Sequence, residues 1–227
     1  MAQILKKLTR VALRDQILDS IRKAIIRGQF KASEKISEED LAVQLGVSRT
    51  PIREAIRILE QQGIVMVIPK GGTYVASFDS EEIKDGLYVR VALEQLALKQ
   101  SFERLSDHEW SEHCGQLQKL LDSMNDAAEK NNTEKNIELD IEWHTNIIDA
   151  ARNHNLSRTW RLTGLSNFIW SIEYRLYPLN AEDLKSAVER HEKQLGILLT
   201  RDPILCAEEL QFHIMRKIKD IDQIKKD

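Results

Sequence analysis

The stretch Ser48-Arg49-Thr50-Pro51-Ile52-Arg53-Glu54-Ala55 decides the fold of the first part of this chain. A serine followed by a proline in the first turn is typical of a helix start, because the first backbone N–H groups have no partner inside the helix. The apolar residues that follow recur at helical spacing, which leaves Arg49, Thr50 and Arg53 on the outer side. A positive helix end with basic and hydroxyl side chains suits a DNA groove, although a solvated surface helix would carry the same residues.

The segments on both sides of this stretch predict a winged helix-turn-helix. A capping pattern at Ser37 precedes a short helix, and a glycine turn at Gly46 leads into the next one. After that helix, two β-prone runs flank a Pro-Lys-Gly-Gly turn, which is typical of a hairpin. This order of elements favours DNA binding, with the third helix in the major groove and the hairpin as a wing. The expected elements are helices over residues 10–28, 37–45 and 49–62 and strands over 64–68 and 73–76.

The composition is that of a globular protein. The chain has 227 residues, of which 42% are hydrophobic and 30% charged. No apolar run approaches the roughly 20 residues that a membrane helix needs, and the first residues lack the features of a signal peptide. Cys114 and Cys206 lie far apart in the sequence, so no disulfide framework or cysteine metal site is indicated. We therefore expect a cytoplasmic protein without a membrane segment.

The charges are distributed unevenly along the chain. Residues 1–78 contain 13 basic and 8 acidic residues, whereas residues 79–227 contain 20 basic and 28 acidic ones. A basic first part followed by an acidic second part indicates that only the first part meets a polyanion. The sequence thus predicts two domains, a DNA-binding domain over residues 1–78 and an all-helical domain over residues 79–227.

The second domain has the pattern of an antiparallel helical bundle. Helix caps and acidic first turns recur, and short breaks separate the helical segments. We expect about six helices of 17 to 26 residues joined by short loops, and no further strand after Ala76. The breaks fall near Leu105, Asn131-Asn132, Asn153-His154-Asn155, Tyr177-Pro178 and Arg201-Asp202.

Four polar residues of this bundle fall on faces that should be buried. Asp140 and His144 are four residues apart on the core side of one helix, and His191 and His213 face inward from two others. A single inward histidine is most often a core residue, but three histidines and a carboxylate together suit zinc, nickel, manganese or iron. A metabolite carboxylate would fill the positions that the protein leaves open on a five- or six-coordinate ion. The remaining histidines fit no ligand pattern and are expected at the surface or in caps: His108, His113 and His154.

The first domain resembles the winged helix of GntR-family transcription regulators. The resemblance covers residues 11–76 and is carried mainly by the Ser-Arg-Thr-Pro-x-Arg-Glu-Ala run quoted above. It implies that the arginines of this run and the turn of the wing contact DNA. Where relatives carry a wing arginine this chain has Gly71, so Lys70 is expected to supply the charge there. The predicted DNA-binding residues are Ser48, Arg49, Thr50, Arg53, Lys70 and Gly72.

The second domain resembles the FCD-type effector domain of the FadR subfamily. The resemblance is carried by segments that include Arg90-Val91-Ala92-Leu93-Glu94, Asp140-Ile141-Glu142-Trp143-His144, Glu189-Arg190-His191 and Phe212-His213-Ile214. It implies that Asp140, His144, His191 and His213 bind a divalent transition metal, with zinc expected first. It also places Arg90 near an effector pocket. The alternative for Arg90 is a surface ion pair with Glu94, worth only about 0.3–0.5 kcal/mol.

Together these features predict a metal-dependent transcription regulator of the GntR family that acts on a palindromic operator as a homodimer, because one recognition helix reads only a few base pairs. A small carboxylate effector bound at the metal would change operator affinity. The resemblance implies a repressor. Two alternatives remain: a metal-dependent enzyme with a DNA-binding head, and a DNA binder whose metal only supports the fold. The attached winged helix argues against the enzyme.

Overall fold

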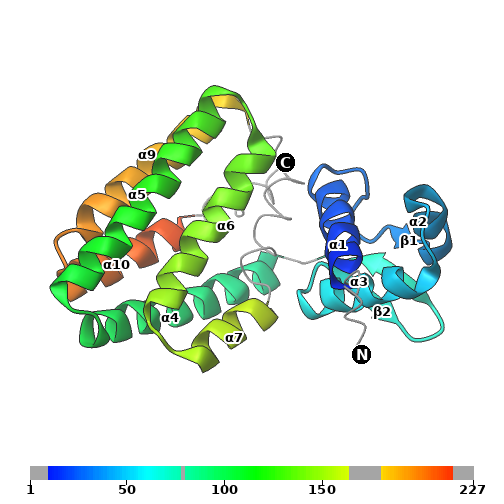
Figure 1. The fold of residues 1–227 in the computed structure, drawn as a ribbon, viewed down its shortest axis with the longest axis horizontal. Coiled ribbons are helices and arrows are strands. Elements are labelled where there is room, and N and C mark those ends of the chain that lie inside the picture. The colour runs from blue at the N-terminus through cyan, green and yellow to red at the C-terminus, as the bar shows by residue number, and fades with distance from the viewer. Residues whose placement is uncertain (1–9, 78–79, 164–179, 217–227) are drawn as a thin grey trace, which may run out of the picture. The chain divides into compact units, whose positions relative to one another are not determined.

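The structure is a computed structural model that describes residues 10–77, 80–163 and 180–216. The chain divides into two compact units, residues 1–77, here called the head, and residues 78–227, here called the body. The described residues are mainly helical, with one small sheet in the head (Figure 1). This confirms the predicted fold class, a winged helix-turn-helix followed by an all-helical domain.

The head contains three helices and a three-stranded antiparallel sheet with strand order β1-β3-β2. Its core is formed by apolar residues of all three helices and of the sheet, with Ile25, Ile52 and Leu59 fully buried. The third helix packs on the first, on the second and on the sheet. The elements are α1 (Arg10–Ile26), β1 (Lys35–Ile36), α2 (Glu38–Leu45), α3 (Arg49–Gln61), β2 (Val65–Ile68) and β3 (Gly72–Val75).

Local signals explain most of these boundaries. The Ser37 hydroxyl accepts a hydrogen bond from the Asp40 backbone N–H and so begins α2. Gly46 ends α2 with a φ of 65°, a left-handed conformation that favours glycine. Ser48 occupies the N-cap position of α3, but its side chain makes no capping hydrogen bond, so the predicted polar cap is wrong in that respect.

Two features of the head depart from the prediction. Leu13 lies on the expected apolar face of α1 but is 41% exposed, because the core contacts of α1 begin one turn later, at Ile17. The strand β1 was not predicted, since two residues carry no detectable alternation. It exists because Lys35 and Ile36 pair with Tyr74 and Thr73 of β3.

The described residues of the body form six helices without a strand. α4 packs against α6, α7 and α10, α5 packs against α6 and α9, and α9 packs against α10. α10, with 13 residues, is shorter than predicted, whereas α7 is described over 10 residues, up to the point at residue 163 where the described range ends. The predicted break at Tyr177-Pro178 lies outside the described residues. The helices are α4 (Ser80–Arg104), α5 (Asp107–Glu129), α6 (Thr133–Ala150), α7 (His154–Thr163), α9 (Ala181–Leu198) and α10 (Pro203–Met215).

Side-chain caps fix the starts of the body helices. Ser106 and Glu109 form a capping box at α5, and Asn180 and Asp183 form another at α9. Asp202 caps α10, which has proline at its first position as predicted. At α6 the cap is one residue earlier than expected: the Asn132 side chain accepts from the Lys135 N–H, and Thr133 is the first helical residue.

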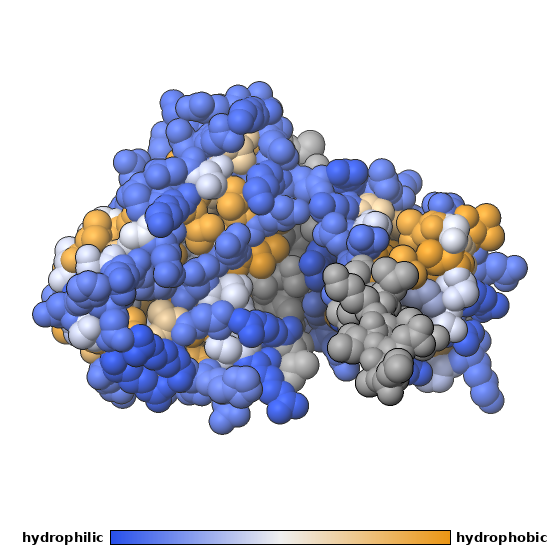
Figure 2. All heavy atoms as spheres, viewed as in Figure 1, coloured by the Kyte–Doolittle hydropathy of each residue, from blue (hydrophilic) through white to orange (hydrophobic). Residues whose placement is uncertain are grey.

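The body core is apolar and aromatic around a small polar centre. Trp143, Trp160 and Leu117 are among its fully buried side chains. On the face seen in Figure 2, hydrophilic residues cover most of the body, and apolar residues show between them. Among the described residues, no helix is both long enough and apolar enough to cross a membrane.

Candidate functional site

The predicted DNA-contacting residues of the head lie at the start of α3. Arg49, Thr50 and Arg53 are all exposed, while Ile52 and Ala55 between them are fully buried in the head core. The buried residues therefore fix the helix and point the polar ones outward. Ser48 is also exposed, and its hydroxyl is not used in capping the helix.

Both arginines share one carboxylate, which the sequence did not reveal. Arg53 donates from Nε to Glu38 Oε2 at 2.7 Å, and Arg49 Nη2 lies 3.6 Å from the same oxygen. Glu38 is the first residue of α2, 15 residues before Arg53, so only the turn between the helices brings them together. The side chains of Arg49 and Arg53 remain 53% and 59% exposed, which leaves their guanidinium groups within reach of a ligand.

The wing carries the two other predicted DNA-contacting positions. Lys70 lies exposed in the turn between β2 and β3 with a φ of 62°, and Gly72 begins β3 with a φ of 117°. A Cβ atom on Gly72 would lie 2.8 Å from Lys35 Cε, so the β1 lysine passes directly beside the wing. Lys35 is exposed, and its Nζ lies 5.9 Å from the ring centroid of Tyr74. It adds a basic residue to the wing that the sequence does not indicate, because no local pattern shows that β1 pairs with β3.

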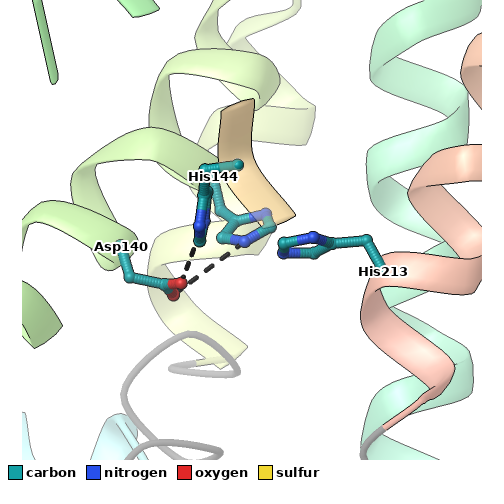
Figure 3. A group of neighbouring side chains, drawn as sticks. Asp140, His144 and His213 are labelled. Atoms are coloured by element: carbon teal, nitrogen blue, oxygen red, sulfur yellow. Dashed lines mark ion pairs between the residues drawn. The ribbon is translucent and has the colours of Figure 1, made fainter. Parts of the chain in front are cut away.

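In the body, the structure brings together the four predicted metal-binding residues. Asp140 and His144 come from α6, His191 from α9 and His213 from α10, and all four are at least 95% buried. One ligand atom from each residue lies within 4.8 Å of the other three. Figure 3 shows Asp140, His144 and His213 pointing toward a common point between the helices. Ligand atoms about 2.0–2.2 Å from one ion lie roughly 3–4 Å apart. The limit of 4.8 Å is somewhat wider than that spacing, so small side-chain adjustments would bring the four residues around a single ion.

Each of the three histidine rings has one nitrogen that makes no hydrogen bond. Two of these nitrogens lie near the Asp140 carboxylate instead, His191 Nε2 at 3.1 Å from Oδ1 and His144 Nε2 at 3.9 Å from Oδ2. His144 Nδ1 lies 2.7 Å from Glu94 Oε2, and His191 Nδ1 lies 2.8 Å from the Ala187 carbonyl oxygen. Each Nδ1 therefore carries the proton that it donates, and each Nε2 presents a lone pair. His144 Nε2, His191 Nε2 and His213 Nδ1 are buried without a hydrogen-bond partner. Because orphaned buried nitrogens are costly, three of them beside one carboxylate fit a metal site.

Arg90 and Glu94 of α4 lie directly behind His144. Arg90 donates from Nε to Glu94 Oε1 at 2.7 Å, and the other oxygen of Glu94 contacts His144. Arg90 and Glu94 are 1% and 0% exposed, so the alternative of a surface pair is wrong. The Arg90 guanidinium carbon also lies 5.9 Å from the Trp160 ring centroid. The sequence identified the Arg90–Glu94 pair but not its contact with a residue 50 positions away.

The electrostatics of this cluster keep His144 and His213 neutral and Glu94 ionised. Burial, followed by the nearby charge of Arg90, lowers the pKa of His144. Burial also holds the pKa of His213 well below its ordinary value. Burial alone would raise the pKa of Glu94, but its interactions with His144 and Arg90 outweigh burial and lower it. Since a neutral His144 carries no charge, Arg90 is the cation that keeps Glu94 ionised.

The three other histidines differ from one another in burial. His108 and His154 are exposed, as predicted, whereas His113 is only 8% exposed and the prediction of a surface position is wrong. His113 packs against Trp110 on the buried face of α5, at a ring distance of 5.3 Å. Burial lowers its pKa to about 4. Its ring does not belong to the four-residue cluster.

Both units of the chain match known protein families. Residues 13–75 match the family described as "Bacterial regulatory proteins, gntR family", and residues 85–216 match the FCD domain. The chain is 27% identical to the "Probable D-xylose utilization operon transcriptional repressor" of Paenarthrobacter nicotinovorans, over 92% of this chain and 88% of that protein. It is also 27% identical to the "HTH-type transcriptional repressor GlaR" of Escherichia coli strain K12, over 89% of this chain and 93% of that protein.

Solved structures share the fold. The structure described as "E. coli McbR/YncC" aligns with a TM-score of 0.73 at 22% identity, covering 94% of this chain and 98% of that one. The matching families and relatives are transcription regulators rather than enzymes, in agreement with the prediction. This chain belongs to the gntR family of bacterial regulatory proteins and carries an FCD domain.

Proposed function

We propose that this protein is a transcriptional repressor whose operator affinity is controlled by a small carboxylate metabolite bound at a divalent metal site in the body. The observation that carries the proposal is the cluster of Asp140 with three buried histidines, each of which has one ring nitrogen without a hydrogen-bond partner. A regulator that needed only a stable fold would gain more from apolar side chains at these positions.

The head supplies the contact with double-stranded DNA. In this proposal Arg49, Thr50 and Arg53 enter the major groove, and Ser48 binds a phosphate with the hydroxyl that capping leaves unused. Lys70 and Gly72 of the wing approach the backbone, and glycine permits close approach because it has no side chain. The repressor assignment is supported by the names of two relatives, both of which are called repressors.

The body supplies the ligand site. Asp140, His144, His191 and His213 would hold the ion, and nitrogen and oxygen ligands suit zinc first, with nickel, manganese or iron as alternatives. The bound ion would offer its open coordination positions to a carboxylate. Arg90 does not contact the proposed ligands directly. Glu94 lies between the Arg90 guanidinium and His144. Arg90 is proposed to orient the effector, either directly or through Glu94.

Two heads are needed to read a palindrome, so the active form is proposed to be a homodimer in the cytoplasm. The effector then acts by linkage: it binds the DNA-competent and the incompetent arrangements with different affinities. An affinity ratio of about 100 between the two arrangements would change operator affinity by at most about 100-fold.

The metal part of the proposal is tested with the double variant His144→Ala/His191→Ala. Elemental analysis should find a divalent metal in the purified wild type and none in the variant, while circular dichroism shows retained helices. Stoichiometric metal in the variant would refute the site. If the variant instead loses its helical signal, the metal has the structural role of the alternative hypothesis.

The DNA part is tested separately with Arg49→Ala and Arg53→Ala. Each should weaken binding to the operator by about 1–3 kcal/mol if the lost contact is to a base. Glu60→Ala, at an exposed position near the other end of α3, serves as the matched control. Gel shifts that show unchanged affinity in both arginine variants would remove these residues from the DNA interface.

A further inference from the structure

Helix α4 carries an exposed stripe on the side opposite to its buried face. The stripe follows alternating spacings of four and three residues, the pattern by which one helix packs along another. The buried side of the same helix carries Leu87, Glu94 and Leu98. The stripe consists of Asp85, Val89, Ala92, Leu96, Lys99 and Glu103, all of them exposed.

The middle of this stripe is apolar, although it faces outward. Val89 is 47% exposed and Leu96 41%, and Ala92 lies between them. Tyr88, which is 60% exposed, borders the stripe on the side toward α10. A solvated helix face would carry charged residues over these two turns, so the composition indicates a surface that is covered by another helix.

A groove lies beside the stripe, between α4 and α10. Its volume is about 690 Å³, and its lining includes Leu98 and Phe102 of α4 and Ile204 of α10. Ile204 is 68% exposed on the rim. The groove therefore offers apolar walls next to the C-terminal half of the stripe, where an aromatic side chain would be buried.

The two ends of the apolar segment carry opposite charges. Asp85 precedes it and Lys99 follows it, at a distance of 14 residues, which is about 21 Å along the helix. At that separation the two side chains of one chain cannot meet. Among the described residues, neither side chain takes part in a hydrogen bond or an ion pair. Their charges are complementary only for a second helix that runs in the opposite direction.

We propose that this face binds the same face of a second copy of the chain, with the two α4 helices antiparallel and the two-fold axis at Ala92. The small side chain of Ala92 permits close approach on the axis. In this register Asp85 meets the partner's Lys99, and Val89 packs beside the partner's Leu96. Both contacts occur twice, because a two-fold interface is self-complementary.

The same register places an aromatic side chain at the groove. Tyr88 and the groove lie on the same side of the stripe, toward α10. The two-fold axis is perpendicular to both α4 helices, so the α10 sides of the two copies lie on the same side of the interface. Tyr88 of each copy thus lies opposite Gln95 and Lys99 of the other, at the wall of its α4–α10 groove. An exposed tyrosine and an apolar groove then cover each other.

This interface rests on the homodimer of the proposed function and specifies where the two copies meet. It would align the two bodies through the helix that also carries Arg90 and Glu94, whose side chains lie on the opposite, buried face of α4. A shift of α4 on effector binding would then act at the dimer interface as well.

The position of the axis is tested with Ala92→Cys in the full-length protein. Only a residue on the axis meets its own copy, so oxidation should convert most of the variant to a disulfide-linked dimer on a non-reducing gel. Ser111→Cys, exposed on α5, is the matched control and should remain monomeric on the gel. The native Cys114 and Cys206 are 2% and 1% exposed and contribute little background. Absence of the cross-linked dimer in Ala92→Cys would overturn the register.

The charge pair is tested by sedimentation of Asp85→Lys, Lys99→Asp and the double exchange. Each single variant places like charges together twice and should raise the dimer dissociation constant about tenfold or more, and the double exchange should restore it. A wild type that sediments as a dimer but does not respond to these exchanges would overturn the interface and leave the proposed homodimer intact. A monomeric wild type would overturn both, whereas the operator gel shifts of Arg49→Ala and Arg53→Ala would still test DNA binding.

Discussion

Glu94 Oε2 lies 2.7 Å from His144 Nδ1, and this contact links the proposed metal ligand to a buried arginine. The other oxygen of Glu94 accepts a hydrogen bond from Arg90 Nε, also at 2.7 Å. All three residues are at most 1% exposed. The carboxylate fixes the tautomer of the imidazole, so that Nε2 faces Asp140 and the other histidines.

Replacement of Glu94 by glutamine should weaken metal binding without removing a ligand. The amide keeps the size of the side chain but removes the negative charge that makes the imidazole a stronger donor. Loss of such a supporting group typically costs 10- to 100-fold in metal affinity. Competition with a chromophoric chelator measures this change. Glu103→Gln, at an exposed position on the same helix, should bind metal like the wild type. Equal affinities in both variants would show that Glu94 does not support the site.

Replacement of Arg90 by alanine should destabilise the body. It leaves the Glu94 carboxylate buried without its cation, and removal of one member of a buried ion pair costs about 3–5 kcal/mol. The double variant Arg90→Ala/Glu94→Gln should lose less than the sum of the single variants, because the unpaired charge is gone. Urea unfolding followed by tryptophan fluorescence reports on the body, since all four tryptophans lie in residues 78–227.

The control for this cycle is Arg158→Ala, at an exposed position of α7, which should change the free energy of unfolding by less than about 0.5 kcal/mol. Additive losses in the double variant would mean that Arg90 and Glu94 are energetically independent. This test also bears on the effector, because a loss of effector response in Arg90→Ala is interpretable only if the metal site remains folded. Arg90→Lys keeps the positive charge and separates the two effects.

Replacement of Glu38 by glutamine should strengthen DNA binding two- to fivefold at low salt. Glu38 pairs with Arg53 at 2.7 Å and lies near Arg49, and its charge opposes the approach of phosphates. Exposed pairs of this kind are worth only about 0.2–1 kcal/mol, which limits the gain. Gel shifts over a series of salt concentrations measure it, with Glu60→Gln as the control. Weaker binding in Glu38→Gln would show instead that Glu38 holds the two arginines in position for the groove.

Local signals were sufficient to predict most of the fold. The caps at Ser37, Ser106 and Asp202 are short-range hydrogen bonds between residues at most three apart, and they are therefore visible in the sequence. Strand β1 is different, because Lys35 and Ile36 are extended only through their pairing with β3. Long-range pairing of two residues leaves no pattern in the sequence.

The residues of the candidate metal site were also predictable from local patterns, because each lies on the inward face of its own helix. Helical spacing placed Asp140 and His144 on one inward face, and each of the other two histidines beside apolar neighbours on its own helix. The spacing could not show that Glu94 reaches His144 from another helix, nor that Glu38 bridges both arginines of α3. Such contacts depend on how helices are packed, and the sequence carries no periodic signal for them.

The metal-free body should lose stability as the pH falls from 6.5 toward 4. His113 is neutral in the fold because burial lowers its pKa to about 4, whereas in the unfolded chain it binds a proton near pH 6.5. Below pH 6.5 the unfolded state therefore binds more protons than the folded state, and the free energy of unfolding decreases, by on the order of 3 kcal/mol at pH 4 for this residue. His144 and His213 act in the same direction, since their pKa values are also lowered.

The contribution of His113 is isolated by His113→Leu, which removes the titrating group from a buried position beside Trp110. In the presence of a chelator, urea unfolding between pH 7 and pH 4.5 should show a smaller loss of stability in this variant than in the wild type. His108→Leu removes an exposed histidine from the same helix and should retain the wild-type pH dependence. If His113→Leu lost stability as steeply as the wild type, the buried metal-site histidines alone would account for the acid sensitivity of the body.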